Sequence, residues 1–380
     1  MVPPHDRPIA APASPAAPLI VADIGGTNAR FGWADQPGGA IEHVRTLSTQ
    51  DHAGPGQAMR RYIEDLPAEC HRAIEGQGMQ AAWALAAIIA GDEISLTNND
   101  WRFSRRAERQ ALSLKALHLY NDFEALAHAL PHLGAGQVRS WDGRLPSLRG
   151  ALAVVGPGTG LGVAGLLPTG SGWHAISGEG GHMTLSAADD FEAEVLRLAR
   201  LQWPHVSAER LLSGIGLPLL HECVAQAMGS PASGEEATAL STESIFARGL
   251  VGEPRARRTL EVFCAMLGSF CGNVALTLGA TGGVFIGGGL VPRLGDLFFQ
   301  SAFRQRFEAK GRFEGYLAGM ATVVITDTMV ALRGASAAAA QAATPSAPQA
   351  GTPAMASPPA GAERPGALPG SSTRPASATT

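Results

Sequence analysis

Hydrophobic and polar positions predict two β-hairpins of the same design. In residues 19–34, LIVADIGGTNARFGWA, an apolar run ends at an aspartate, a Gly-Gly turn follows, and apolar residues then alternate with small ones. Residues 152–167, LAVVGPGTGLGVAGLL, repeat the order of apolar strand, glycine turn and apolar return. Gly158-Thr159 then aligns with Gly26-Thr27, which suggests a duplicated unit whose hairpins can face each other across a cleft. Chance similarity of two glycine-rich hairpins is the alternative.

The rest of the pattern predicts alternating strands and helices. Apolar runs bounded by turn residues favour buried strands, and apolar positions three and four residues apart favour helices. The clearest helical stripe carries Gly268 and Gly272 one turn apart, where a small face admits close approach of another backbone. The predicted strands are 83–90, 117–123 and a short strand between two glycine turns within 282–290. The predicted helices are 57–66, a helix through Leu126 and Leu130 that Pro131 ends, 190–202, a helix from Ser207 as N-cap to Gly214, and 259–278.

Composition places these elements in an α/β protein with low-complexity ends. The chain has 380 residues, of which 45% are hydrophobic and 47 are glycine, which allows about two domains. Residues 1–18 are rich in proline and alanine, and residues 334–380 are rich in alanine, proline, serine and glycine. Both segments are predicted to be disordered, so the folded body is expected at about 19–340.

Charge and cysteine usage narrow the class of protein. A net charge of −4 leaves no basic footprint for nucleic acid. The four cysteines form no Cys-x-x-Cys zinc clamp and no dense disulfide framework, which favours a reducing cytoplasm. Two of them, Cys264 and Cys271, fall in the 259–278 helix and are expected in the core. The apolar patch 83–90 is less than half a membrane span, and prolines interrupt the N-terminal segment as a signal peptide.

The glycine turns indicate phosphate chemistry but exclude two familiar sites. Glycine N–H groups can approach an anion closely, and Asp23 at the end of a buried strand needs a partner or a cation. A hairpin for phosphate and its metal is therefore one interpretation, and a plain hairpin with an aspartate in its turn is the other. No turn contains Gly-Lys-Ser/Thr, which excludes a Walker loop. The turn in 156–162 returns as a strand, whereas a dinucleotide fingerprint must open a helix.

Eight motifs together are similar to a known family. They are DIGGTNAR at 23–30, TNNDW at 97–101, NDF at 121–123, GPGTGLG at 156–162, GEGGH at 178–182, HVSAERLLSG at 205–214, GGVFIGGGLVPR at 282–293 and KGRF at 310–313. In this order, over about residues 19–327, they resemble bacterial glucokinases of the hexokinase, actin and chaperone-ATPase superfamily.

The resemblance implies both a fold and an activity. The fold is α/β, with two ribonuclease-H-like domains flanking a cleft. The activity is ATP-dependent phosphorylation of D-glucose at the 6-hydroxyl, a cytoplasmic reaction of glucose metabolism with Mg²⁺ as cofactor. Glucose and ATP are the expected partners, with no nucleic acid or membrane. Family members are commonly homodimers, and no residue here decides the oligomeric state. The expected divisions are a disordered arm at 1–18, a small domain of 19–132 plus about 325–340, a large domain at 133–324, and a disordered tail at 341–380.

The resemblance also carries residue roles. Asp122 is implied as the general base, and a carboxylate at a strand end does point into the crevice where α/β sheets bind ligands. Its alternative is a cap on the following helix. The implied sugar ligands are Asn98, Asn121, Asp122, Glu179, His182 and Glu209, suited to hydroxyls that both donate and accept hydrogen bonds. The implied nucleotide site is Ala22, Asp23, Ile24, Gly25, Gly26, Thr27, Gly158, Thr159, Gly160, Gly287 and Gly288, with Asp23 near Mg²⁺ directly or through water.

Without the family pattern, several of these residues have plainer interpretations. Glu179 and His182 then form a solvated loop pair. Glu209 lies in the first turn of the helix after Ser207, where the helix dipole favours a carboxylate on a surface.

Three departures from the family pattern leave alternatives open. Ile88 stands where proline is usual, Glu124 stands where threonine is usual, and residues 327–334 replace an Asp-x-Pro-Gly turn and a glycine-leucine helix start. These changes put catalytic efficiency and terminal-helix packing in question. One alternative is a kinase for another hexose, although the repressor-type zinc motif Cys-x-Cys-Gly-x-x-Gly-Cys is absent. Another is a sugar-sensing regulator that binds without phosphorylating.

Overall fold

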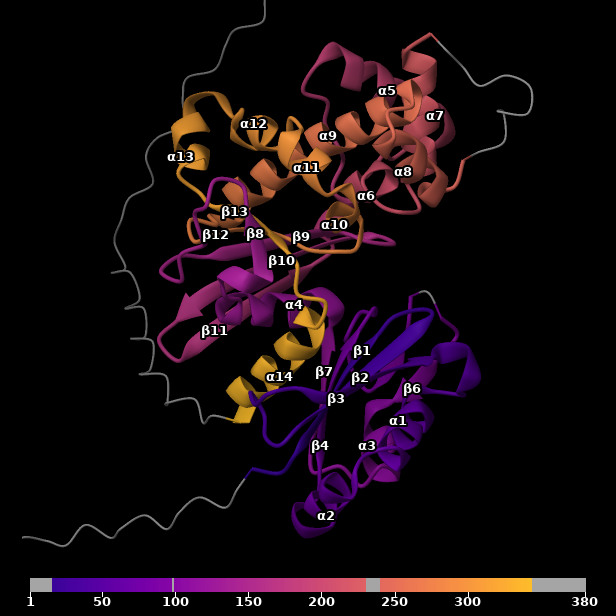
Figure 1. Ribbon diagram of the computed structural model, residues 1–380, viewed down its shortest axis with the longest axis vertical. Coiled ribbons are helices and arrows are strands. Elements are labelled where there is room, and N and C mark those ends of the chain that lie inside the picture. Colours follow the sequence, from indigo (N-terminus) through magenta and orange to yellow (C-terminus); the bar gives the residue numbers. More distant parts are fainter. Residues whose placement is uncertain (1–15, 98, 230–239, 344–380) are drawn as a thin grey trace, which may run out of the picture. The chain divides into compact units, whose positions relative to one another are not determined.

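The computed structural model describes residues 16–97, 99–229 and 240–343. Two larger sheets hold most of the strands (Figure 1). The first sheet has the order β3-β2-β1-β4-β7, and the second has the order β11-β10-β9-β12-β13-β8. The strands are β1 Leu19–Ile24, β2 Asn28–Ala34, β3 Glu42–Ser48, β4 Gln80–Leu85, β5 Glu93–Ser95, β6 Arg102–Ser104, β7 Leu117–Asn121, β8 Val138–Ser140, β9 Leu152–Pro157, β10 Leu161–Thr169, β11 Gly172–Gly178, β12 Gly283–Ile286 and β13 Thr322–Ile325.

The two sheets share one plan, which confirms the duplicated unit predicted from the hairpins. In the first sheet, β1 pairs antiparallel with β2, β2 antiparallel with β3, and β1 and β7 lie parallel to β4 on either side. In the second, β9, β10 and β11 form the antiparallel part, and β9, β12 and β13 the parallel part. Strand β8 adds an antiparallel edge to the second sheet alone.

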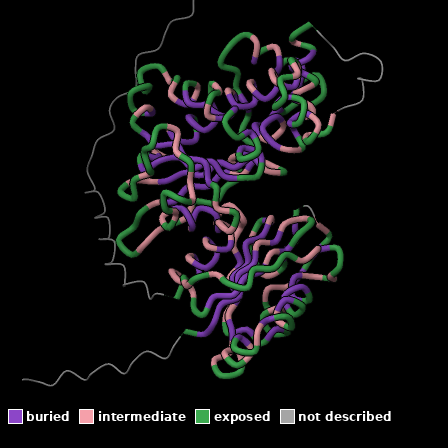
Figure 2. Tube along the Cα trace, viewed as in Figure 1, coloured by how far each residue is buried: buried purple, intermediate pink, exposed green. Residues whose placement is uncertain are grey.

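Helices follow the parallel strands, as expected for crossover connections. They are α1 Pro55–Glu64, α2 Ala68–Gln77, α3 Arg105–Ala111, α4 Asp122–Ala129, α5 Asp190–Gln202, α6 Ala208–Leu211, α7 Leu217–Ala227, α8 Thr242–Leu250, α9 Pro254–Leu278, α10 Leu290–Leu294, α11 Asp296–Gln300, α12 Phe303–Glu308, α13 Glu314–Ala318 and α14 Val330–Ala343. Figure 2 shows the buried positions concentrated along the strands and along the inner faces of these helices.

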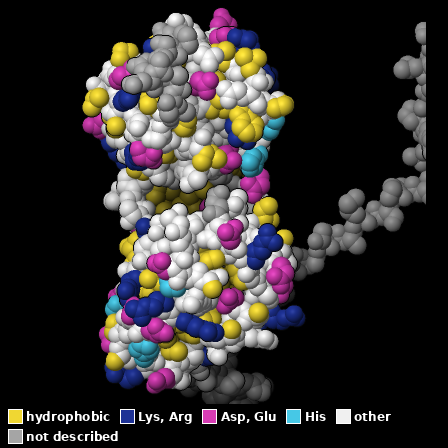
Figure 3. All heavy atoms as spheres, turned by 90° about the vertical axis from the view of Figure 1, so that its right-hand side faces the viewer, with side chains coloured by type: hydrophobic (Ala, Val, Ile, Leu, Met, Phe, Trp, Pro, Cys, Tyr) yellow, Lys and Arg dark blue, Asp and Glu magenta, His cyan; other side chains and the backbone are white. Residues whose placement is uncertain are grey.

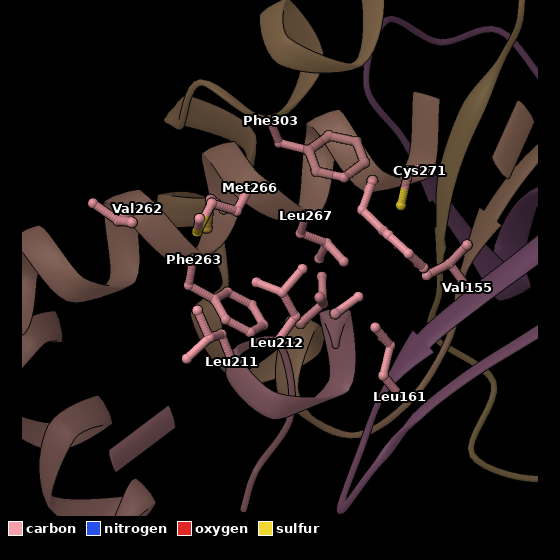
Figure 4. Close-up of a cluster of buried hydrophobic side chains, with 14 of the residues drawn as sticks. Val155, Leu161, Leu211, Leu212, Val262, Phe263, Met266, Leu267, Cys271 and Phe303 are labelled. Atoms are coloured by element: carbon pink, nitrogen blue, oxygen red, sulfur yellow. The ribbon is translucent and has the colours of Figure 1, made fainter. Parts of the chain in front are cut away.

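Helix α9 is the centre of the largest core. It begins at Pro254, five residues before the predicted start, and Glu253 caps it by accepting from the N–H groups of Arg255 and Ala256. Its Phe263, Met266 and Leu267 meet side chains from the second sheet and from helices α6 and α12. Figure 4 labels the cluster: Val155, Leu161, Leu211, Leu212, Val262, Phe263, Met266, Leu267, Cys271 and Phe303.

The small face of α9 admits close approach of another backbone, as predicted. A Cβ at Gly268 would lie 2.2 Å from the Phe303 carbonyl oxygen, and one at Gly272 would lie 2.5 Å from that of Phe307. Helix α12 therefore packs backbone to backbone on α9. Among the described residues, α9 is the one helix long and apolar enough to span a membrane, but 78% of that apolar window is buried inside the protein. All four cysteines are free and buried, and Cys264 and Cys271 lie in the core as expected.

Three predicted boundaries are wrong, because neighbouring elements decide where the ladder or helix stops. Strand β4 ends at Leu85, not at residue 90, since its neighbours β1 and β7 end at the same level. Strand β7 ends at Asn121, so Asp122 and Phe123 belong to α4. Helix α6 ends at Leu211. Beyond it, the Ser213 hydroxyl donates to the Glu209 carbonyl, and the Gly214 N–H donates to the Gly158 carbonyl, so neither continues the helix.

The predicted disorder from residue 334 onward is wrong up to residue 343. Helix α14 continues to Ala343 and lies beside α4, β1 and β4 (Figure 1). Small side chains make this possible: a Cβ at Gly334 would lie 1.7 Å from the Ala125 carbonyl oxygen. At the other end, Ala17 and Pro18 are buried, and the Pro18 carbonyl accepts from Gln80 N at 2.9 Å. Residues 1–15 and 344–380 lie outside the described residues, and the division into domains at 132 and 324 stays a prediction.

Candidate active site

The junction of β7 and α4 presents the candidate base. Asn121 ends the strand and caps the helix, with its Oδ1 accepting from Phe123 N at 2.9 Å. Its Nδ2 donates to the Ala87 carbonyl at 3.2 Å, which ties the cap to the segment after β4. Glu124 closes a capping box by accepting from Asn121 N at 3.4 Å. Asp122 is therefore held at the first position of a helix whose start is fixed by several capping hydrogen bonds.

The surroundings of Asp122 raise its pKa to about 6. Burial is the main cause, and the carboxylates of Asp23 and Glu179 add repulsion, while the Phe123 N–H lowers the pKa. Two of the predicted site residues, one from each predicted domain, therefore lie within electrostatic range of Asp122. A carboxyl group with this pKa is ionised at neutral pH and yet is a better proton acceptor than an exposed aspartate.

Hydrogen bonds accepted by its backbone carbonyl oxygens fix the first glycine turn. Thr49 Oγ1 donates to Gly26 O at 2.8 Å, and Asn99 Nδ2 donates to the same oxygen at 2.9 Å. Thr49 N also donates to Thr27 O at 2.9 Å. No acceptor within the described residues takes the N–H groups of Gly26 and Thr27, so both are open to an anion.

Asp23 lies on β1 two residues before this turn, opposite Arg30 on β2. Burial raises the pKa of its carboxyl group, and the Arg30 guanidinium opposes the rise. Among the described residues, no three histidine, cysteine, aspartate or glutamate side chains gather as a metal-binding group.

The second glycine turn and the loop after β12 are packed together. Gly288 has φ +74°, and a Cβ there would lie 2.4 Å from the Pro157 carbonyl oxygen, so the position requires glycine. Gly287 N donates to Val155 O at 2.9 Å. On the other side of the turn, Gly158 O accepts from Gly214 N at 2.8 Å. Residues 156–160 and 287–289, far apart in the sequence, thus form one glycine-lined surface.

Glu209 and His182 lie against that turn. Glu209 Oε2 accepts from Leu161 N at 2.8 Å, and its Oε1 lies 3.8 Å from His182 Nε2. A Cβ at Gly160 would lie 2.4 Å from Glu209 Oε2, so glycine also makes room for this carboxylate. Glu179 and His182 are exposed, at the end of β11 and in the 3-10 turn Gly180–His182. The helix-dipole interpretation of Glu209 is therefore incomplete, because the side chain reaches the second hairpin.

The structure also brings in residues that the sequence did not single out. Thr49 and Asn99 support the first turn, and only Asn99 lay within a recognised motif. Phe123, predicted as part of a strand, places its ring over Gly156 and Gly162, where Cβ atoms would lie 2.6 Å and 2.0 Å from it. It links α4 to β9 and β10. The predicted sugar ligand Asn98 lies outside the described residues.

Comparison with known proteins identifies the family to which the chain belongs. It matches the glucokinase family over residues 20–342. It is 45% identical over 320 residues to a glucokinase of Aromatoleum aromaticum, covering 84% of this chain and 93% of that protein. The chain belongs to the glucokinase family. A bifunctional protein glk of Paraburkholderia xenovorans is 44% identical over 320 residues, and this chain spans 48% of its length. The family expected from the motifs is therefore confirmed.

Solved glucokinases have the same fold. A glucokinase from an Antarctic psychrotroph matches with a TM-score of 0.74 at 35% identity, covering 85% of this chain and 98% of that one. A ROK family glucokinase from Streptomyces griseus, solved with glucose and AMPPNP, matches with a TM-score of 0.53 at 19% identity, covering 84% and 98%. The second likeness shows the fold alone. The predicted two-domain, actin-like α/β class is confirmed.

The residues that depart from the glucokinase pattern have places in this fold. Glu124 serves the capping box, and burial raises its pKa while the Asn121 N–H and the Ser177 hydroxyl lower it. Ile88 is 71% exposed in the segment after β4. Asp327 accepts from Gln137 Nε2 and from Arg333 Nε, both at 2.7 Å, which fixes the start of α14. The concern about terminal-helix packing is answered by these contacts.

Proposed function

We propose that Asp122 is the general base of an ATP-dependent glucose kinase that transfers a phosphoryl group to the 6-hydroxyl. Glucose phosphorylation is the activity that the family and the relatives at 44% and 45% identity support. One observation carries the residue-level proposal. Asp122 is a partly buried carboxylate with a pKa of about 6, held at a capped helix start next to the Asn121 amide and within electrostatic range of Asp23 and Glu179.

Asp122 has the properties that deprotonating an alcohol needs. With a pKa of about 6, about nine-tenths of the enzyme holds it ionised at pH 7. A positioned base of this kind contributes about 10²- to 10⁴-fold to the rate. The hydroxyl then attacks the γ-phosphorus in line as ADP leaves, and most of the remaining catalysis is positioning and charge stabilisation.

The sugar ligands are proposed from the groups around Asp122. Asn121 has its Oδ1 and Nδ2 engaged by the helix and by Ala87, so it orients Asp122 and offers the sugar its remaining hydrogen-bond capacity. Glu179 and His182 are exposed and available. Glu209 has its Oε1 turned toward His182, which leaves that oxygen for a hydroxyl. Asn98 is retained as a proposed ligand on the motif alone.

The nucleotide site is proposed at the two turns and the loop 287–289. The open N–H groups of Gly26 and Thr27 suit phosphate oxygens. The close packing of Gly288 on the Pro157 backbone holds the loop 287–289 against the second turn, so that the two can act as one surface. Ala22, Ile24 and Gly25 complete the first turn, and Gly158, Thr159, Gly160 and Gly287 line the second surface.

Mg²⁺ is compatible with the residues present. It is usually held by one or two carboxylates together with substrate phosphates and water, and Asp23 is such a carboxylate next to the open turn. We propose Asp23 as its protein ligand, directly or through water. When bound, the ion neutralises charge on the triphosphate. Burial raises the pKa of the Asp23 carboxyl group, and the Arg30 guanidinium opposite it on β2 favours the ionised form that would bind the ion.

The decisive experiment replaces Asp122 by asparagine. The variant Asp122→Asn keeps the shape but cannot accept a proton, so we expect glucose-dependent ADP release to fall by at least about 10²-fold. Glucose binding, measured by calorimetry, should stay within a few-fold of wild type. Asp190→Asn, in the exposed first turn of α5, is the matched control and should keep full turnover. Turnover near wild type in Asp122→Asn would refute the proposed base.

The same assay separates the alternatives. A panel of hexoses with coupled ADP detection distinguishes glucose from mannose or an N-acetylhexosamine. Glucose-dependent stabilisation without ADP release would instead identify a regulator. The capping contact of Glu124 accounts for that departure structurally, so it no longer favours the regulator.

We infer a cytoplasmic enzyme of glucose metabolism, in keeping with four free buried thiols. Its oligomeric state is left to light scattering. Figure 3 shows acidic and basic side chains interspersed on one face of the molecule.

A further inference from the structure

A basic cavity lies away from the proposed active site, at the opposite end of β7. Its volume is about 480 Å³, within the range of small-molecule sites. The lining comes from the start of α3, the link to β7, the first residues of β7, and one aspartate before β5. The lining residues are Asp92, Arg105, Arg106, Arg109, Lys115, Ala116, Leu117 and His118.

The charges of this cavity are unbalanced. Four lining residues carry positive charge and one, Asp92, carries negative charge. Both oxygens of Asp92 are already engaged: Oδ2 accepts from Ser104 Oγ at 2.6 Å, and Oδ1 accepts from Arg106 N at 2.9 Å. Among the described residues, no carboxylate forms an ion pair with any of the four cations, although Asp92 lies within electrostatic range of Arg105 and Arg106. In a chain of net charge −4, this local excess of positive charge favours the binding of an anion.

Arg105, which lines the cavity, also carries a hydrogen-bond donor that has no partner in the described part of the chain. Its Nε is buried and has no hydrogen-bond acceptor among the described residues. A buried guanidinium N–H without an acceptor is costly, and native structures supply one from protein, water or a ligand. The backbone N–H of Arg105 is bound to Asp92 O at 2.8 Å, so the start of α3 is fixed.

The remaining cations are preorganised around the same space. Arg109 donates from Nε to Leu114 O at 3.3 Å and from one terminal nitrogen to Lys115 O at 2.9 Å, which fixes the link between α3 and β7. The Lys115 stem lies over Gly78, where a Cβ would be 2.9 Å from its Cε. Burial and Arg105 lower the pKa of His118, so its imidazole is neutral at neutral pH and adds a hydrogen-bonding nitrogen without further charge.

We propose that this cavity is a binding site for a small phosphate-bearing anion, held by Arg105, Arg106 and Lys115. Guanidinium groups match phosphate oxygens with paired N–H donors, and a doubly charged phosphate satisfies several cations at once. The ligand is free phosphate, pyrophosphate or a phosphorylated sugar, which share this chemistry. The site stands on its own contacts and does not depend on the proposed catalytic roles.

Calorimetric titration of the full chain tests the site. Inorganic phosphate, pyrophosphate and glucose 6-phosphate are titrated at low ionic strength, with glucose and a non-hydrolysable ATP analogue present to occupy the proposed active site. We expect binding to wild type that weakens as salt is added. In the double variant Arg106→Gln/Lys115→Gln, whose side chains are exposed, the affinity should fall by about tenfold or more, since each lost charge-assisted bond is worth at least that in favourable cases.

The controls make the result specific. Arg72→Gln/Arg102→Gln removes two exposed positive charges outside the cavity lining and should keep the affinity within about twofold. Circular dichroism and the melting temperature check that both variants fold. Tighter binding of glucose 6-phosphate than of pyrophosphate, or the reverse order, supports the site and identifies the source of the phosphate. Absence of binding to wild type, equal affinity in the cavity variant, or citrate binding as tightly as pyrophosphate overturns the proposal.

Discussion

Replacement of Gly334 by alanine tests the segment where sequence and structure disagree most. A Cβ at this position would lie 1.7 Å from the Ala125 carbonyl oxygen, 2.6 Å from the Ala125 carbonyl carbon and 3.2 Å from Ala129 N. These are backbone atoms of α4 and cannot rotate away. Helix α14 must retreat by about 1.5 Å, although Leu332 and Ala335 on the same helix are buried against β1 and β4.

The magnitude follows from two opposing terms. Overpacking of a fixed backbone costs about 3 kcal/mol, and the better helix propensity of alanine returns about 1 kcal/mol. We therefore expect Gly334→Ala to lower the free energy of unfolding by about 2 kcal/mol, or the melting temperature by about 3 °C for a folded body of this size. Because α4 begins at Asp122, the same displacement should also lower turnover by about tenfold.

The assay is urea unfolding followed by circular dichroism, with Gly76→Ala as the matched control. Gly76 is also helical but has open space around its Cβ position, so alanine there should stabilise by about 0.5–1 kcal/mol. The two variants thus move in opposite directions from wild type. If Gly334→Ala is at least as stable as wild type, α14 does not pack on α4 as described and the prediction is refuted.

Four further predictions concern pH, the first turn and the core. Because the pKa of Asp122 is raised to about 6, kcat/KM should fall about tenfold per pH unit below 6, and a plateau extending to pH 5 contradicts the assigned base. The stability that this carboxyl contributes when protonated is lost as pH rises through about 6, so Asp122→Asn should be more stable than wild type at pH 8, with the difference vanishing below about pH 4. Thr49→Val removes the 2.8 Å bond to Gly26 O and should raise KM for ATP by about threefold to tenfold, with Thr49→Ser restoring it; an unchanged KM excludes a role for this support. Arg304 is buried and donates to three backbone carbonyls and a hydroxyl, so Arg304→Met should cost about 2–4 kcal/mol in chemical unfolding, whereas exposed Arg200→Met should cost less than about 0.5 kcal/mol.

Those parts of the protein that depend on local order can be predicted from the amino-acid sequence. Hydrophobic alternation around glycine turns predicted both hairpins, and the duplicated topology followed from their similarity. The helix at 190–202 was predicted with its observed bounds, because its apolar spacing and its capping Asp189 act within one turn. The motif order was sufficient to identify the family.

Where elements end, and which distant groups meet, depends instead on packing in three dimensions. Strand β4 stops at Leu85 because its neighbours stop, and no local signal records the length of a neighbour. Residues 334–343 look like low-complexity sequence, yet small side chains let α14 pack closely on α4. Burial is the main cause of the raised pKa of Asp122, and repulsion from Asp23 and Glu179, which are remote in sequence, adds to it. Electrostatic and packing energies depend on distance in space, so a one-dimensional pattern names such groups but cannot bring them together.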